Sequence, residues 1–293
     1  MNHLSLSRKV YLAFNLLVLT LLSLFCLAPV VNCLALSLSG SQAIASGKVT
    51  FWPIDFSWSS YRYIFSQDLF GISFVNSCKR LLLGTVIQMF ITIISAYPLS
   101  KEPKDFRWRS VYMWFFLVTM LFSGGLIPAY LQIKQLKILD TIWALILPGA
   151  VSVYNIILLM NSFRSLPHEL EESFYVDGAN HHHVLWRLYL PLSMPSVATI
   201  LLFTMVGHWN SWFDGMIYMN HTENFPLATY LHSVVVNFDF KNMTYEQVKQ
   251  ASEITTRSTK CSQIIVGMLP ILCVYPFLQR FFVKGLVMGS VKG

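Results

Sequence analysis

The sequence predicts an all-α integral membrane protein with six transmembrane helices and both termini in the cytoplasm. Of its 293 residues, 55% are hydrophobic and 12% are charged, about half the charged share of a soluble domain. Apolar runs long enough to cross a bilayer recur along the chain. Basic residues gather beside these runs, as topology signals do. The net charge of +7 therefore fits a membrane protein, and we expect no nucleic-acid partner.

The first predicted span follows the basic pair Arg8 and Lys9 and covers about 10–36. Its apolar run is roughly twice the 7–15 residues of a signal-peptide core, so we predict a retained helix. Residues 37–80 mix polar and aromatic side chains, which predicts an external loop at the membrane surface. A short cytoplasmic turn is predicted at 101–109, where four of nine residues are basic.

The remaining spans alternate with one long cytoplasmic segment and one long external segment. The six predicted spans cover about 10–36, 81–100, 111–130, 141–163, 190–212 and 261–282. Residues 164–190 form the predicted cytoplasmic loop, and 213–260 form the second external loop. Glycine and proline inside the third, fourth and sixth spans predict either kinked packing helices or a path that opens and closes.

No pattern in the sequence predicts catalysis or metal binding. The phosphate-loop pattern G-x4-G-K-[ST] is absent: Gly47 and Lys48 are followed by Val49. The histidines at 181–183 are consecutive, so on a helix they point about 100° apart and would not chelate one ion. The five cysteines form no CxxC pair, which makes a metal site or a disulfide framework unexpected. We therefore expect no catalytic residue, metal or cofactor in this chain.

The most informative stretch is the polar segment 166–195. Glu171 and Glu172 lie in the acidic start of a predicted short helix, which suits the positive end of the helix dipole. Gly178 is placed to stop that helix, and Asp177 is placed to cap a second one running from about 180 to 190. Pro191 can open the next membrane helix. The pattern predicts a helix–turn–helix on the membrane surface that another protein holds.

These residues also carry a family resemblance. Glu172-Ser173-Phe174, three residues, Gly178, nine residues and then LYLP at 188–191 resemble E-A-A-x3-G-x9-I-x-L-P. That signature marks the coupling loop of bacterial ABC-importer permeases. Ser173 and Phe174 replace its two alanines, which implies an altered pocket in the ATPase partner. DGA at 177–179 is similar to the carbohydrate importers, and the runs FSGGLIP at 122–128 and YPFLQ at 275–279 resemble the subgroup that imports complex oligosaccharides.

The resemblance covers essentially the whole chain and implies the type I ABC importer permease fold. It implies that the 166–191 loop couples the chain to ATPase subunits. The residues expected to take part are Glu171, Glu172, Asp177, Gly178 and Pro191. On an exposed helix, Glu171 and Glu172 could pair with arginines of the ATPase, or they could be ordinary acidic residues at a helix start.

Further contacts are expected in the second half of the chain. A sugar site needs flat aromatic faces and hydrogen-bonding side chains, and carbohydrate permeases often carry a similar Trp-Asn-x-Trp element. The residues expected to line the substrate path or to contact the binding protein are His208, Trp209, Asn210, Trp212 and Asn220. His208 could instead lie in the interfacial belt. Gly289 and Gly293 resemble the glycine-rich tail that reaches the ATPase dimer, although Gly285 and Gly289 also fit a helix-packing motif.

The resemblance implies a set of partners in the bacterial cytoplasmic membrane. They are a homologous second permease, two ATPase subunits that bind ATP and Mg²⁺, a periplasmic or lipid-anchored sugar-binding protein, and lipid. Arg62, Lys79 and Arg80 could attract an acidic sugar or could anchor the chain at the interface. An ion-coupled secondary transporter is the alternative, but it would need ionisable groups inside the spans, which hold almost none. A membrane enzyme using the histidine cluster lacks a nucleophile–base pair.

Overall fold

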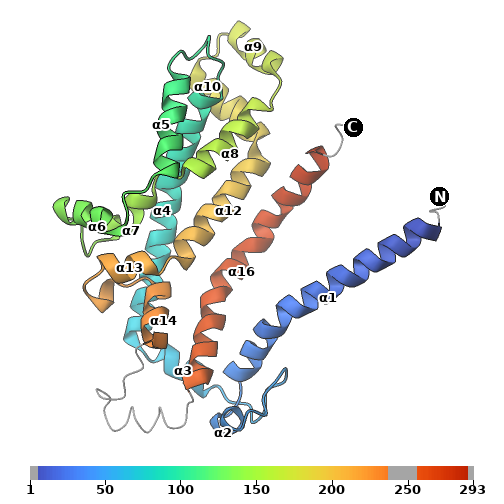
Figure 1. The fold of residues 1–293 in the computed structure, drawn as a ribbon, viewed down its shortest axis with the longest axis vertical. Coiled ribbons are helices and arrows are strands. Elements are labelled where there is room, and N and C mark those ends of the chain that lie inside the picture. Colours follow the sequence, from blue (N-terminus) through green and yellow to red (C-terminus); the bar gives the residue numbers. More distant parts are fainter. Residues whose placement is uncertain (1–5, 237–255, 290–293) are drawn as a thin grey trace. The chain divides into compact units, whose positions relative to one another are not determined.

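The computed structural model describes residues 6–236 and 256–289, which form helices joined by turns and loops and contain no strand. The chain divides into two compact units: Met1–Asp68 with Val234–Leu269, and Leu69–Ser233 with Pro270–Gly293. Each unit is described on its own, because their relative placement is not determined (Figure 1). The second unit holds every candidate site discussed below that lies in the described residues.

The first unit contains α1 (Leu6–Ser37), α2 (Ser41–Ala45), α3 (Ser59–Phe65) and the start of α16 (Thr256–Gly289). Serine side chains join the end of α1 to the start of α16. Ser258 Oγ donates to the carbonyl of Leu36 at 3.2 Å, and Ser262 Oγ donates to that of Ser37 at 3.4 Å. The apolar window of α1 has no buried residue, so this helix leaves a long apolar surface for lipid or another subunit.

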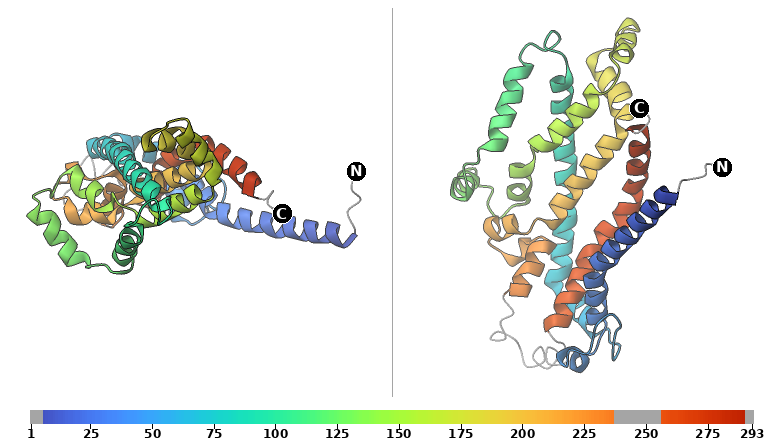
Figure 2. Two further views of the ribbon diagram at one scale, coloured as in Figure 1. Left: turned by 90° about the horizontal axis from the view of Figure 1, so that it is seen from above. Right: turned by 45° about the vertical axis from the view of Figure 1, so that its right-hand side comes forward.

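The second unit is built around α4 (Asp68–Ser100), the longest helix of this unit. Figures 1 and 2 show α8 and α12 beside it in each view. Its further helices are α5 (Arg109–Leu121), α6 (Leu126–Gln135), α7 (Ile142–Ile146), η1 (Leu147–Gly149), α8 (Val153–Arg164), α9 (His168–Val176), α10 (His181–Val184), η2 (Leu185–Tyr189), α11 (Leu190–Leu192), α12 (Met194–Asn210), α13 (Phe213–Tyr218), η3 (Thr222–Asn224) and α14 (Leu227–Val236).

The apolar core of this unit lies between α4, α8, the α10–η2 segment and α12. Met89 and Ile93 of α4 pack with Ile156 of α8, Leu188 of η2 and Ile200 of α12. Burying such side chains contributes roughly 1.5–3 kcal/mol each in water, but within a bilayer close packing matters more. The core thus joins the end of α4 to the α9–α10 region that precedes α12.

Membrane spans are recognised by length and apolar composition, and the described helices satisfy both criteria either singly or as bent pairs. Three described helices qualify alone: Ser7–Ser37, Asp68–Ser100 and Arg257–Pro276. Three bent pairs qualify together, with bends of 112° between α5 and α6, 47° before α8 and 83° before α12. Six spans result if each bent pair is one span, and that number stays a prediction. The first two breaks lie at the predicted glycine and proline positions, and Gly125 takes the left-handed φ of 87° that favours glycine.

Two predicted loops contain helices. The predicted external loop 37–80 includes α2, α3 and the first turns of α4, which begins at Asp68 rather than near 81. The predicted loop 213–260 includes α13, η3, α14 and the start of α16. Its residues 237–255 lie outside the described part of the chain.

Candidate coupling site and polar cavity

The helix α9 is the short surface helix that the sequence predicts. Glu169 and Glu171 occupy its first turn, where the helix dipole favours negative charge. It ends as predicted at Gly178, whose φ of 77° only glycine adopts readily. The amide of Gly178 donates to the backbone carbonyl of Tyr175 at 3.0 Å, and the amide of Ala179 donates to the backbone carbonyl of Phe174 at 2.9 Å. These two bonds form a Schellman cap, which fixes the turn between α9 and α10.

The second helix of this segment begins where the sequence predicts, but another residue caps it. Asn180, and not Asp177, caps α10, because the Asn180 side chain accepts from the amide of His183 at 3.0 Å. The helix then runs through η2 and α11, which contains Pro191, and a bend separates it from α12. The chain direction thus changes at Ser193, just inside the predicted fifth span of 190–212.

The three neighbouring histidines point to different partners. His181 Nδ1 lies 3.1 Å from the Tyr97 hydroxyl and 2.8 Å from that of Tyr175. The ring of His182 lies beside Trp186, and His183 bonds Asn180. Among the described residues, no group of three or more His, Cys, Asp or Glu side chains could hold a metal ion.

A buried ion pair anchors α9 to the end of α4. The Glu171 carboxylate accepts from Lys101 Nζ, from the Tyr189 hydroxyl at 2.6 Å and from the Tyr175 hydroxyl at 2.9 Å. Glu171 is 4% exposed and Lys101 is 7% exposed. The Lys101 ammonium also lies 4.2 Å from the ring centre of Tyr97 and 4.3 Å from that of Tyr189, where aromatic faces favour a cation.

The surroundings of Glu171 favour its ionised form. Burial alone would raise the pKa of Glu171, but the hydrogen bonds from Lys101, Tyr189 and Tyr175 hold it below its ordinary value. Each carboxylate oxygen has a donor, so the desolvation of the charge is compensated. We call Glu171, Lys101, Tyr175 and Tyr189 the anchor of α9.

Glu172 differs from its neighbour. Its side chain is exposed and has an ion-pair contact with His168 Nδ1 at 3.3 Å within the same helix. The sequence predicts both carboxylates on one exposed helix, but only Glu172 is exposed, because consecutive residues on a helix point about 100° apart and Glu171 is buried. The part that Glu171, Glu172, Asp177, Gly178 and Pro191 take in coupling stays a prediction.

A cavity of about 580 Å³ lies between α4, the α7–η1 turn, α8, α12 and α13. Its polar lining includes Gln88, Asn155, Thr204 and His208. Asn155 Nδ2 and Thr204 Oγ1 are 3.4 Å apart. Amide, hydroxyl and imidazole groups of this kind can exchange hydrogen bonds with a polar ligand. We call this space the polar cavity.

A second buried ion pair borders the polar cavity. The Arg80 guanidinium donates to both carboxylate oxygens of Asp214 and to the carbonyl of Ser211 at 3.1 Å. Asp214 also accepts from Ser211 Oγ and from the amide of Gly215, each at 2.9 Å. Arg80 is 2% exposed and paired with Asp214, so it is neither an exposed interfacial anchor nor an unpaired cation for an acidic sugar, the two uses that the sequence left open. The signal that could have identified this pair is a charge inside a long helix, which needs a partner.

The predicted substrate residues lie in different places. His208 is buried and lines the polar cavity, with its ring against Gly84 of α4. Trp209 is buried against Phe74, with ring centroids 5.9 Å apart. Trp212 stacks on His232 at 3.8 Å. Asn210 is exposed, and neither it nor the two tryptophans lines the polar cavity.

Asn220 belongs to a different surface cluster, centred on Asp140. Asp140 accepts from the amide of Asn220 at 2.9 Å and from His221 Nδ1 at 2.5 Å. Burial opposes ionisation, but the hydrogen bonds from His221, Asn224 and the backbone amides lower the pKa of Asp140 to about 2. The same contact raises the pKa of His221. This cluster holds the 219–225 segment to the turn before α7.

The expected tail contacts are only partly described. Gly289 is the last residue of α16. Gly293 lies outside the described residues.

Over the described residues, an all-helical fold with long apolar helices, a polar cavity between helices and an anchored surface helix fits a membrane permease. Residues 69–287 match the family "Binding-protein-dependent transport system inner membrane component". The chain belongs to this family and is the inner-membrane permease component of an ABC import system. The predicted resemblance is therefore confirmed, and the ion-coupled transporter is set aside.

Named relatives and a solved structure resemble the chain over nearly its full length. It is 37% identical over 275 residues to the polygalacturonan/rhamnogalacturonan transport system permease protein YtcP of Bacillus subtilis (strain 168), covering 94% of this chain and 96% of that one. It is 38% identical over 285 residues to Protein LplC of the same organism, covering 97% and 96%. A chain of a bacterial ABC transporter involved in the import of the acidic polysaccharide alginate matches with a TM-score of 0.86 and 29% identity, covering 96% and 100%. That match agrees with the resemblance of the runs 122–128 and 275–279 to the subgroup that imports complex oligosaccharides, in which an alginate-oligosaccharide importer is the nearest expected relative.

Proposed function

We propose that this chain is the transmembrane subunit of an ATP-driven importer that translocates an oligosaccharide delivered by a solute-binding protein. The saccharide class is supported by relatives, one named for polygalacturonan/rhamnogalacturonan transport and one involved in alginate import. The partners in this proposal are a homologous second permease, two ATPase subunits and a periplasmic or lipid-anchored binding protein. ATP and Mg²⁺ bind the ATPase subunits, and this chain contributes no catalytic residue.

The observation that carries the proposal is that one glutamate of α9 is buried in an ion pair while the next is exposed. Glu171 is fixed to Lys101 at the end of α4, whereas Glu172 faces outward with an exposed side chain. A partner can shift a conformational equilibrium only by binding two states with different affinity. An outward carboxylate offers that partner a charge-assisted contact, and the anchor transfers its displacement to α4.

The polar cavity supports the same proposal as a part of the substrate path. Its amide, hydroxyl and imidazole groups suit the hydroxyl groups of a saccharide. The charges of Arg80 and Asp214 compensate each other, so a carboxylate of an acidic sugar would find no unpaired cation at this pair. We therefore expect hydrogen bonding to sugar hydroxyls, rather than charge neutralisation, to govern contacts here.

The test is a pull-down of the tagged chain from detergent-solubilised membranes. We expect the wild type to retain the ATPase subunits and a second permease, and Glu172→Lys to lose the ATPase because charge reversal turns attraction into repulsion. Glu169→Lys is the matched control, since this glutamate lies on α9 outside the signature. A wild-type chain that purifies intact and alone would overturn the proposal.

A further inference from the structure

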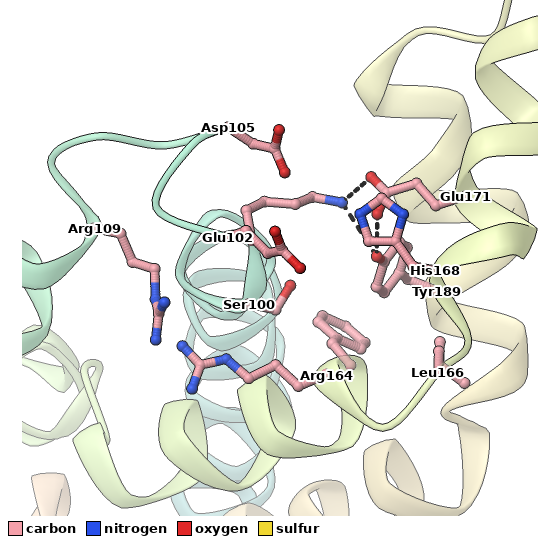
Figure 3. A pocket seen from close by; sticks show the side chains of 11 residues that line it. Ser100, Glu102, Asp105, Arg109, Arg164, Leu166, His168, Glu171 and Tyr189 are labelled. Atoms are coloured by element: carbon pink, nitrogen blue, oxygen red, sulfur yellow. Dashed lines mark hydrogen bonds and ion pairs between the residues drawn. The ribbon is translucent and has the colours of Figure 1, made fainter.

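A second cavity, of about 380 Å³, adjoins the anchor of α9. The ends of α4 and α8, the 101–109 turn and α9 surround it. Figure 3 shows the guanidinium groups of Arg109 and Arg164 close together on one side of this cavity. The carboxylates of Asp105 and Glu171 lie toward its other side, and that of Glu102 is drawn between the two groups.

The charges around this cavity are unequally paired. Lys101 is paired with Glu171, and Lys104 with Glu102 at 3.0 Å. Within the described part of the chain, neither Arg109 nor Arg164 forms an ion pair with a carboxylate. Two cations that lie close together repel each other unless an anion lies between them.

The hydrogen bonds of the two arginines leave donors free. Arg164 donates from one terminal nitrogen to the carbonyl of Leu99 at 2.9 Å. The Nε of Arg109 is buried and has no acceptor among the described residues. A buried donor without an acceptor is unfavourable, so an acceptor supplied from outside the chain would stabilise this arrangement.

The position of Arg109 adds to the positive potential. It is the first residue of α5, a helix of 13 residues with no acidic side chain in its first turn. The start of a helix carries partial positive charge and disfavours a cation unless an anion is bound there. Two guanidinium groups and a helix start therefore favour an oxyanion, and the planar guanidinium matches phosphate oxygens in a two-pronged contact.

The residues next to Arg109 in the chain indicate the source of that oxyanion. Trp108, immediately before it, is 64% exposed, and tryptophan favours the membrane–water interface. The helix that follows has no buried residue, and its exposed side chains are apolar or aromatic except for Ser110 and Thr119. Arg109 thus begins a helix that, together with α6, has the length and composition of a membrane span, and the start of such a helix suits the headgroup layer.

We propose that Arg109 and Arg164 bind the phosphate of an anionic membrane phospholipid in this cavity. The bound headgroup joins the start of α5 to the end of α8, beside the anchor that holds α9. Occupancy of the site therefore stabilises the region that carries coupling, and the transporter responds to the anionic lipid content of its membrane. The proposal is independent of which saccharide is imported.

The experiment uses the assembled, delipidated transporter in a neutral detergent. Its thermal unfolding midpoint is measured against mixed micelles of phosphatidylglycerol, against phosphatidylcholine and against inorganic phosphate. Arg109→Gln with Arg164→Gln removes both cations, and Arg107→Gln is the matched control, because Arg107 is exposed in the same turn and does not line the cavity. If the double variant does not assemble, Arg164→Gln alone is used, because this side chain is exposed.

We expect phosphatidylglycerol to raise the midpoint of the wild type and of Arg107→Gln, and the apparent affinity to fall by about tenfold or more without the two arginines. Equal responses of wild type and arginine variants would overturn the proposal. An equal shift with inorganic phosphate would assign the site to free phosphate and overturn the lipid source. Loss of the ATPase from the variant with an unchanged lipid response would assign the arginines to an acidic partner protein.

Discussion

Two buried ion pairs hold the helix α4 to its neighbours, and they differ in how they are enclosed. Lys101 and Glu171 lie among tyrosine rings and hydroxyls, and both side chains are almost fully buried. Arg80 and Asp214 border an open polar cavity, and the Asp214 side chain is 24% exposed. The first pair fixes a surface helix to the core, whereas the second shapes the wall of a cavity. Charge burial in this chain thus serves two mechanical tasks.

The largest effect is expected from breaking the enclosed pair. Glu171→Ala leaves the Lys101 ammonium buried without its counter-charge, which lowers the free energy of unfolding by about 3–5 kcal/mol. Denaturant unfolding of the purified chain in detergent measures this. Glu172→Ala is the control and is expected to change stability little, because its side chain is exposed. Equal losses in the two variants would show that Glu171 is not an anchor.

A smaller effect is expected from breaking the cavity pair. In Arg80→Met, Asp214 keeps its bonds from Ser211 and Gly215 and gains water from the cavity. We expect a loss of about 2–3 kcal/mol, the range of a hydrogen bond to a charged group. The same unfolding measurement applies. A loss as large as that of Glu171→Ala would remove the contrast between the two pairs.

The wall of the polar cavity gives a third, more local test. A Cβ on Gly84 would lie 2.6–2.9 Å from atoms of the His208 ring, so Gly84→Ala displaces the imidazole and costs about 1–2 kcal/mol through overpacking. His208→Ala in the same chain should restore stability, which a double-mutant cycle measures. Additive effects of the two substitutions would contradict the contact.

The smallest effect is expected at the exposed Asp140–His221 contact. Asp140 raises the pKa of His221, so the contact contributes fully below the ordinary pKa of histidine and is lost as pH rises through the raised value. Because the pKa of Asp140 is lowered to about 2, its carboxylate becomes protonated, and the contact weakens, only as pH falls toward 2. We expect wild type to unfold at a higher temperature than His221→Gln near pH 6 and to lose that advantage at high pH. An advantage that grows with pH would contradict the contact.

Local signals in the sequence predicted local structure well. The glycine at 178 ends α9, and the acidic residues before it occupy the first turn. The glycine and proline positions in the third and fourth predicted spans lie at the observed bends. Each of these features depends on a few neighbouring residues, whose backbone preferences decide the outcome.

The sequence did not predict which distant side chains meet. Glu171 lies 70 residues from Lys101, and Asp214 lies 134 residues from Arg80. Both pairings depend on tertiary packing, so charge patterns alone left Glu171 indistinguishable from Glu172. The sequence likewise predicts one substrate site at 208–212. In the structure, His208 lines the polar cavity, whereas Trp209 packs on Phe74 and Trp212 packs on His232.

The most direct test of the anchor is the ratio of saccharide imported to ATP hydrolysed by the reconstituted transporter. Lys101→Met with Glu171→Gln replaces the pair by uncharged side chains of similar volume, which buried ion pairs often tolerate. We predict that the variant still binds its ATPase through Glu172 and still hydrolyses ATP. Its imported saccharide per ATP should fall by about fivefold or more, the range of a coupling free energy above 1 kcal/mol. An assembled variant with the wild-type ratio would contradict the role of the anchor in coupling.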